Sequence, residues 1–203
     1  MARRFFDPER GIWKPLGVLG DLVMLSLLWG VCCIPVLTVG SATAAAYDTA
    51  VHALRRKDDA LLGRFFSTFK RELKSGILST LLWLGVLALE GLLYRGLLSA
   101  LPEGESRSAV LIFYLVLVGF FTLCVFAWVF PTLSRFTFGV GGLNATALRL
   151  AFGHILRSAG LAVLLGGSAW LCFRFGLPIM VLPGLAAYLA TFLIEPVFAL
   201  YEK

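Results

Sequence analysis

Long apolar runs separated by short polar stretches dominate the pattern of this chain. Five runs are long enough to consider as membrane crossings, at residues 16–37, 77–98, 109–130, 159–173 and 177–201. A crossing needs about 20 residues, so the fourth run is short, and we expect its helix to extend over 156–158. The pattern predicts an all-α fold, a polytopic membrane helix bundle in which residues 1–203 form a single membrane domain.

An amphipathic pattern precedes the second run, at residues 58–75. Apolar side chains recur there at helical spacing, and basic side chains fill the remaining positions, which is typical of a helix lying in the membrane interface. We expect lipid contacts from three aromatic residues at the acyl boundary and from three basic residues among the phosphates: Phe65, Phe66, Phe69, Lys70, Arg71 and Lys74.

A weaker amphipathic pattern, at residues 143–157, precedes the fourth run in the same way. Aligning Phe69 with Phe152 also pairs Ser75 with Ser158, so each segment becomes an amphipathic helix that leads into a crossing. This similarity has two interpretations. Either the chain contains two parallel structural repeats, which are common in transporters, or two leucine-rich segments align by chance.

Residues 41–54 are too polar to face lipid, yet they carry a stripe of small side chains at Ala42, Ala46, Ala50 and Ala53. Small residues let helices approach closely inside a membrane. The segment therefore predicts a short return helix that is buried in the bundle.

The distribution of basic residues distinguishes two topologies. With five crossings, neither orientation concentrates the 18 Lys and Arg residues on one side. With the return helix as a sixth crossing, fifteen lie on one side and three, Arg95, Arg107 and Arg174, lie on the other. Because basic residues concentrate on the cytoplasmic side, we favour six crossings and expect both termini in the cytoplasm.

The composition narrows the class of protein. Apolar residues make up 59% of the chain and charged residues 15%, whereas soluble domains have about 45–50% and about 25%. With a mean hydropathy of +0.88, most of the chain must have lipid as its solvent. The net charge of +6 then reflects a basic cytoplasmic side, and we expect no nucleic-acid partner.

Motifs of enzymes and metal sites are missing from the sequence. The two histidines and four cysteines form no CxxC or H-E-x-x-H spacing, and neither a phosphate-binding loop nor a nucleophile elbow is found. We therefore expect no enzyme activity, no cofactor and no metal.

Ionisable residues within the apolar segments are the informative ones, because a charge in hydrocarbon is costly. Asp48 and His52 share one face of the return helix, while Asp21 and Glu195 lie near the cytoplasmic ends of the first and last crossings. These four residues form a candidate polar site. Either it opens to the cytoplasm and holds a proton, a cation or a polar substrate, or it only joins helices by hydrogen bonds.

Two blocks of sequence resemble a known family. The first is PVLTVGSATAA at 35–45 with FFSTFK at 65–70, and the second is FPTLSRF at 130–136 with residues 144–156. They closely resemble the YesL-type family of bacterial membrane proteins, which carries a domain of unknown function. The resemblance covers nearly the whole chain. It implies a bacterial inner-membrane protein whose gene often neighbours carbohydrate-uptake and glycan-degradation genes, and it carries over no catalytic residues.

Two functions are compatible with these features. The first is an accessory or assembly partner of a membrane system linked to carbohydrate uptake, such as a carbohydrate ABC importer, with anionic lipid headgroups as further contacts. The second is a small oligomeric transporter or channel with a carboxylate-lined polar site. The repeat and the short return helix favour the second. The small size of the chain and the gene neighbours implied by the resemblance favour the first, which we expect.

Overall fold

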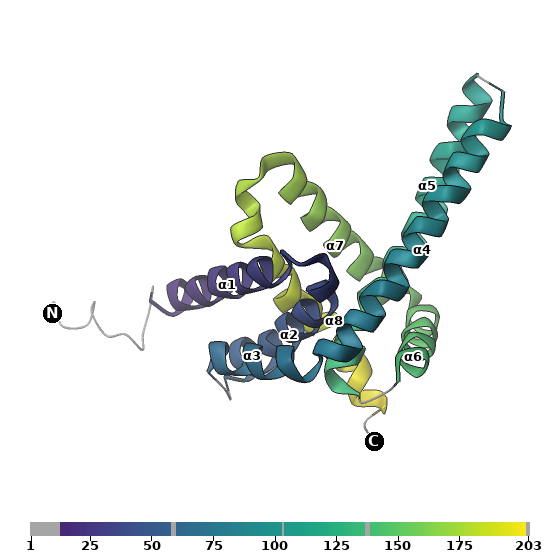
Figure 1. The fold of residues 1–203 in the computed structure, drawn as a ribbon. Helices are drawn as coiled ribbons and strands as arrows, with labels where there is room; N and C mark the ends of the chain where they lie inside the picture. The colour runs from purple at the N-terminus through teal and green to yellow at the C-terminus, as the bar shows by residue number, and fades with distance from the viewer. Residues whose placement is uncertain (1–12, 58–59, 103, 137–138, 202–203) are drawn as a thin grey trace, which may run out of the picture.

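The computed structural model describes residues 13–57, 60–102, 104–136 and 139–201. Within these ranges the chain is all-α, as predicted, with eight α-helices (Figure 1). They are α1 (Trp13–Cys32), α2 (Val39–Thr49), α3 (Leu61–Arg71), α4 (Leu73–Ala100), α5 (Glu105–Arg135), α6 (Val140–Gly153), α7 (Ile155–Phe175) and α8 (Leu182–Tyr201). Short 3₁₀ segments, Val36–Thr38 and Leu177–Met180, precede α2 and α8, and a π-helical segment, Ala50–Arg56, continues α2.

Four of the described helices are long and apolar enough to cross a membrane: α4, α5, α7 and α8. The fourth predicted run reaches this length because its helix begins at Ile155. The first predicted crossing, at 16–37, is wrong in length, because α1 ends at Cys32 and its apolar part, Gly17–Cys32, is shorter than the four candidate spans. Proline disfavours helix in the residue before it, so Pro35 accounts for the end of α1, and the Thr38 hydroxyl donates to the Cys32 carbonyl oxygen at 2.6 Å.

The shorter predicted segments differ from the observed helices at their ends. The return helix, predicted at 41–54, begins at Val39 and continues as π-helix to Arg56. The segments predicted at 58–75 and 143–157 are each divided, because α4 already begins at Leu73 and α7 at Ile155. Residues 58 and 59 lie outside the described residues.

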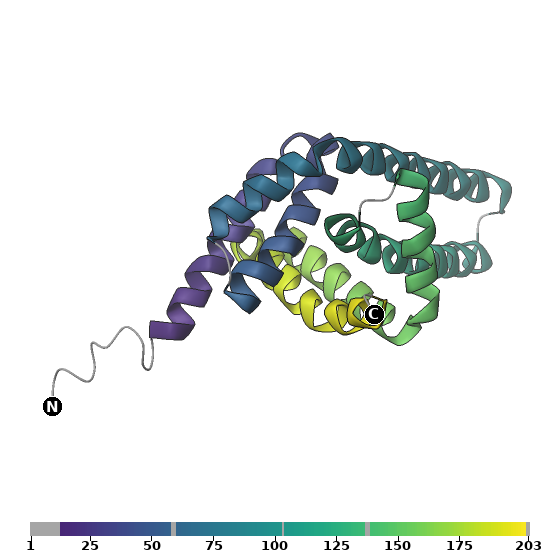
Figure 2. The same ribbon diagram turned by 90° about the horizontal axis from the view of Figure 1, so that it is seen from below.

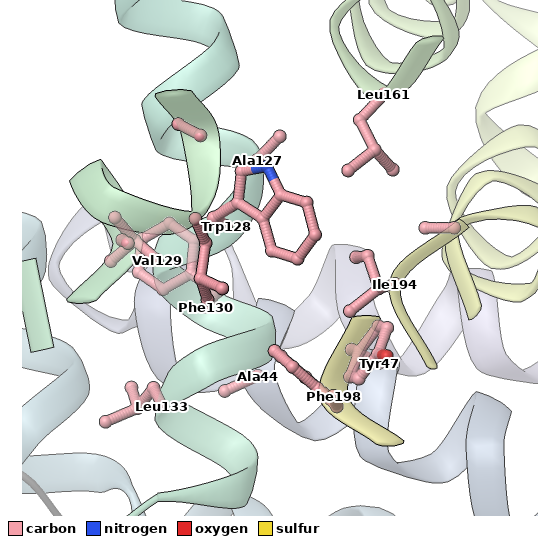
Figure 3. Packing of buried hydrophobic residues seen from close by; sticks show 14 of the residues in the cluster. Ala44, Tyr47, Ala127, Trp128, Val129, Phe130, Leu133, Leu161, Ile194 and Phe198 are labelled. Carbon is pink, nitrogen blue, oxygen red and sulfur yellow. The ribbon is translucent and has the colours of Figure 1, made fainter. Parts of the chain in front are cut away.

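The main hydrophobic core lies where α2, α5, α7 and α8 meet (Figure 3). Trp128 and Phe130 of α5 pack there with Ile194 and Phe198 of α8, and all four side chains are buried. The indole N–H of Trp128 donates to Ser158 Oγ on α7 at 2.8 Å, which satisfies the polar end of an otherwise apolar side chain. The predicted burial of the return helix is confirmed, because Gly40, Ser41 and every residue from 44 to 49 are buried.

The two short helices, α3 and α6, lead into the long helices α4 and α7 in the same way. A single residue separates each pair, Glu72 in the first and His154 in the second. Pairing these two residues superposes the buried positions: Gly76, Ser79 and Thr80 of α4 on Ser158, Leu161 and Ala162 of α7. Each of the two long helices thus buries one face directly after its short helix. This pairing differs by one residue from the predicted alignment of Phe69 with Phe152.

Helices α4 and α5 form a hairpin whose tip extends beyond the other helices (Figures 1 and 2). The buried residues of α4 are confined to 76–83, and those of α5, apart from Leu111, to 124–134. The outer half of the hairpin, residues 84–100 and 106–121, therefore packs mainly on itself. Within it, Tyr114 donates its hydroxyl to the Glu90 backbone oxygen at 3.1 Å, and Thr122, the next residue of α5 after this half, donates to the Glu90 carboxylate.

Candidate functional site

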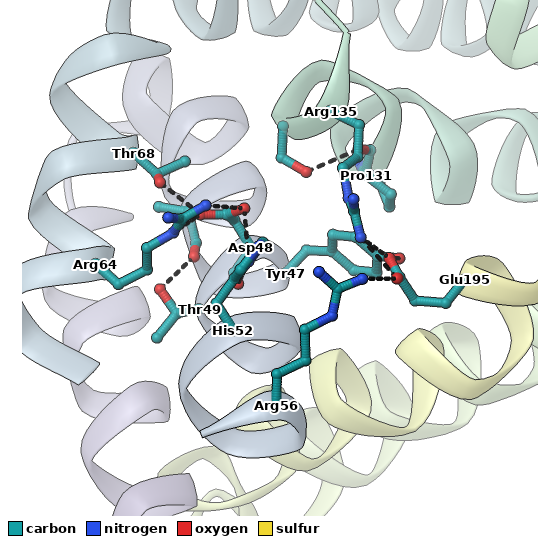
Figure 4. A network of polar contacts seen from close by, with 12 residues as sticks. Tyr47, Asp48, Thr49, His52, Arg56, Arg64, Thr68, Pro131, Arg135 and Glu195 are labelled. Atoms are coloured by element: carbon teal, nitrogen blue, oxygen red, sulfur yellow. Dashed lines mark hydrogen bonds and ion pairs between the residues drawn. The ribbon is translucent and has the colours of Figure 1, made fainter. Parts of the chain in front are cut away.

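The Asp48 carboxylate is buried between the end of α2 and the face of α3 (Figure 4). Arg64 donates from Nε to Oδ2 at 2.5 Å and from Nη2 to Oδ1 at 3.0 Å, which is the bidentate geometry of a strong ion pair. Thr68, one turn further along α3, donates its hydroxyl to Oδ2 at 2.7 Å. His52 Nδ1 lies 3.3 Å from Oδ1. We call these four residues the Asp48 cluster.

Glu195, on α8, faces the ends of α2 and α5 (Figure 4). Arg135, at the end of α5, places Nη2 2.5 Å from Oε1 and 2.6 Å from Oε2. Tyr47 donates its hydroxyl to Oε1 at 3.1 Å, and Arg56 reaches Oε2 at 3.3 Å. The Arg135 side chain is 14% exposed and that of Arg56 46%, so water weakens the Arg56 pair much more. These four residues form the Glu195 cluster.

The end of α2 supplies residues to both clusters. Consecutive residues of a helix point about 100° apart, so Tyr47 faces Glu195 while Asp48 faces α3. The π-helical segment then carries Arg55 and Arg56, both of which reach α8. Arg55 donates from Nη1 to the Thr191 backbone oxygen at 3.0 Å. Lys57, whose φ of 58° is left-handed, ends the segment. The two clusters thus tie α2 to α3 on one side and to α5 and α8 on the other.

The structure divides the predicted polar site. Asp48 and His52 lie together, as their spacing indicates, and Glu195 belongs to the neighbouring cluster through Tyr47. Asp21 belongs to neither cluster and is exposed on α1. The partners of the Asp48 carboxylate come from α3, and not from the first and last helices that carry Asp21 and Glu195.

The predicted lipid-interface residues also separate into two groups. Phe65 is 0% exposed and packs with residues of α1 and α2, so its assignment to the acyl boundary is corrected: it is a core residue. The reason is that the Phe65 face of α3 lies against α2. Phe69 is half-buried against the same core, whereas Phe66 is exposed. The basic side chains of Lys70, Arg71 and Lys74 are exposed.

Sequence reasoning does not identify five residues of the two clusters: Arg64, Thr68, Arg135, Tyr47 and Arg56. One signal is available, because Arg64 and Thr68 are four residues apart, as are Asp48 and His52, and residues at that spacing share a helix face. The amphipathic pattern instead places Arg64 on its basic face. Arg135 and Glu195 are 60 residues apart, and no local spacing reveals such a pair.

The chemistry of both clusters is that of ion pairing. Each carboxylate accepts hydrogen bonds from arginine and hydroxyl donors. Among the described residues, no three His, Cys, Asp or Glu side chains lie close enough together to hold a metal ion. The arrangement is suited to holding the ends of four helices together at one place.

Comparisons with known proteins give one match. No curated protein and no solved structure matches the chain. The match covers Leu22 to Tyr94, which includes the Asp48 cluster but neither Glu195 nor Arg135. Residues 22–94 of this chain match the model of a family described as "Protein of unknown function, DUF624".

Proposed function

We propose that the protein is a membrane-embedded accessory or assembly partner of another membrane protein, and that the outer half of the α4–α5 hairpin is its docking surface. The observation that carries this proposal is the exposure of that half (Figure 1). Gly85 and Gly91 on α4 have open space where a side chain would be. Glycines allow close approach of a second transmembrane helix.

A carboxylate in the hairpin adds support. Glu90 lies ten residues before the end of α4, about 15 Å along the helix axis, and its neighbours in the hairpin are Thr122 and Tyr114. A polar residue at such depth is costly in lipid. Contact with a partner helix would remove it from hydrocarbon.

The ion pairs weigh against the second function, a small oligomeric transporter or channel. A carboxylate-lined pathway needs carboxylates that can release their partners for a proton or a cation. Asp48 is held by Arg64, which binds both of its oxygens, and by Thr68. Glu195 is held by Arg135, whose side chain is mostly buried. Releasing either one would leave a charged arginine with little exposure.

The resemblance to the YesL-type family supports a more specific proposal. The partner is a component of a carbohydrate-uptake system, such as a carbohydrate ABC importer, in a bacterial inner membrane. On the cytoplasmic side of the membrane, anionic lipid headgroups contact the exposed Lys70, Arg71 and Lys74. No part of this proposal requires catalysis.

We expect both termini to lie in the cytoplasm. In Figure 1, α3, α6 and the end of α8 lie toward the lower side, while the hairpin tip and the far end of α7 lie toward the upper side, which supports the separation of fifteen basic residues from three. Arg3, Arg4, Arg10 and Lys203 enter this count but lie outside the described residues. A reporter active only in the periplasm should be silent when fused to either terminus, and activity at one terminus alone would restore five crossings.

The docking surface can be tested by photo-crosslinking in native membranes. A photoreactive amino acid at Leu92 or Phe113, both exposed on the hairpin, should give a protein adduct of one defined mass. Mass spectrometry should identify it as a subunit of a carbohydrate importer. The same amino acid at Phe173, exposed at the end of α7, should give lipid adducts only.

A matched variant controls for chance encounters in the membrane. Gly91→Leu adds a side chain where no atom of this chain lies within 4 Å, so folding should be unaffected while the adducts at Leu92 and Phe113 fall several-fold. Lipid adducts alone at both hairpin positions would contradict the docking surface. Solute movement by the purified protein alone in liposomes would contradict the accessory role.

A further inference from the structure

An internal cavity of about 440 Å³ lies among α1, α2, α5, α7 and α8. Its volume falls within the range of about 300–1,000 Å³ that is typical of small-molecule sites. Helices α2, α5, α7 and α8 contact one another in a ring around it, and Trp29 of α1 also lines it. None of its lining residues lies in the outer half of the hairpin, so a ligand site here is independent of the proposed docking function.

The cavity is closed at one end and open at the other. At the closed end it is lined by Tyr47, Phe130 and Leu161, which are buried. At the other end it is lined by Ala169 and Ile179, which are exposed, and by Cys172, which is half-buried. Both Leu161 and Cys172 line it, and α7 rises about 16 Å between them, so the cavity is elongated along α7. Its mouth lies at the end of α7, a candidate membrane span.

The lining of the cavity is apolar. Among its lining residues only Thr43, Tyr47 and Ser168 carry hydroxyl groups, and each hydroxyl already donates its hydrogen. Thr43 donates to the Val39 carbonyl oxygen, Tyr47 to Glu195 and Ser168 to the Leu165 carbonyl oxygen. A buried water needs two to four polar partners, so this lining favours a hydrocarbon occupant over water or a polar solute.

We propose that the cavity binds a single hydrocarbon chain of a membrane lipid, which enters from the bilayer at the Ala169–Ile179 mouth and extends toward Tyr47. The bilayer around α7 supplies such chains, and the elongated shape accepts one chain rather than a compact ligand. The chain can come from a free fatty acid or from a phospholipid whose headgroup stays outside. Both sources present the same hydrocarbon chain to the apolar lining of the cavity.

Trp29 provides the readout, because bromine atoms quench tryptophan fluorescence on contact. The contribution of Trp29 is the difference in emission between the wild type and Trp29→Phe. Purified full-length protein is titrated with a dibrominated fatty acid in one arm and a dibrominated phosphatidylcholine in the other. We expect quenching of Trp29 that saturates at a low mole fraction of brominated lipid. Trp170, exposed on α7 and measured in the same way with Trp170→Phe, should show quenching proportional to mole fraction.

Two variants obstruct the cavity, and a third, with the same substitution elsewhere, serves as their control. Ala187→Phe occupies its interior, and Ala169→Phe narrows its exposed mouth, where a larger side chain leaves the core packing untouched. Both should abolish the saturable quenching of Trp29, whereas Ala88→Phe, exposed on α4, should retain it. Saturation with only one probe would support the site and show whether the bound chain comes from a fatty acid or from a phospholipid. Proportional quenching of Trp29 with both probes, or saturation that survives Ala169→Phe, would overturn the proposal.

Discussion

Replacing Gly76 with alanine is expected to destabilise the protein by about 3 kcal/mol, the upper end of the cost of overpacking a core. Here α4 crosses α2 with almost no space between the backbones. A Cβ at Gly76 would lie 2.6 Å from the Ser41 backbone nitrogen and 2.8 Å from its Cα. Neither atom can move without shifting α2, and the Gly40 N–H that donates to Thr80 Oγ1 at 3.0 Å would move with it.

A second glycine on the same helix provides the control. A Cβ at Gly85 would meet no atom within 4 Å, and alanine is a better helix former than glycine by about 1 kcal/mol. Gly85→Ala should therefore melt at the same temperature as the wild type or slightly higher, while Gly76→Ala should melt well below it. Thermal unfolding in detergent, followed by circular dichroism, measures both. Equal melting temperatures would show that the two helices are not in contact at this point.

Much of this architecture could be predicted from hydrophobic periodicity and residue size. The alanine stripe of residues 41–54 correctly indicates a buried helix, because small side chains in a polar segment have no role facing lipid. The length of the first helix could not be predicted as well. Apolar residues continue to Leu37, and only the geometry at Pro35 shows that the helix ends at Cys32.

The candidate site could be predicted only in part, for a physical reason. The spacing of Asp48 and His52 places both on one face, and that relation is local. The partner of Asp48 depends on the rotation of α3 about its own axis. The amphipathic pattern does not fix this rotation, because it does not show which of the apolar residues face the protein. Phe65 and Phe66 are equally apolar, yet one is buried and the other exposed. Arg64, beside the buried phenylalanine, therefore faces the protein.

Asp48→Asn is expected to destabilise the protein by about 2–5 kcal/mol, the cost of truncating one partner of a buried charge pair. The groups nearest the carboxylate are the Arg64 guanidinium and the Thr68 hydroxyl, which both donate. An asparagine at this position offers one oxygen and presents an NH₂ group to donors. The Arg64 side chain, only 27% exposed, would then carry a charge that is poorly compensated. Asp21→Asn, a change to an exposed acid on α1, should stay within about 0.5 kcal/mol of the wild type.

A double-mutant cycle separates the ion pair from other effects of the Asp48 substitution. If the Asp48 cluster acts by joining α2 to α3, Asp48→Asn combined with Arg64→Gln should be much less destabilised than the sum of the two single variants, because no uncompensated charge remains. Each variant is melted in detergent and tested for the Leu92 adduct in native membranes. A normal melting temperature for Asp48→Asn with loss of the adduct would contradict the joining role and direct attention back to an ion-binding role. We expect Asp48→Asn to lose both stability and the adduct, and Arg64→Gln to restore both in part. The reason is that α4, the first helix of the hairpin, directly follows α3.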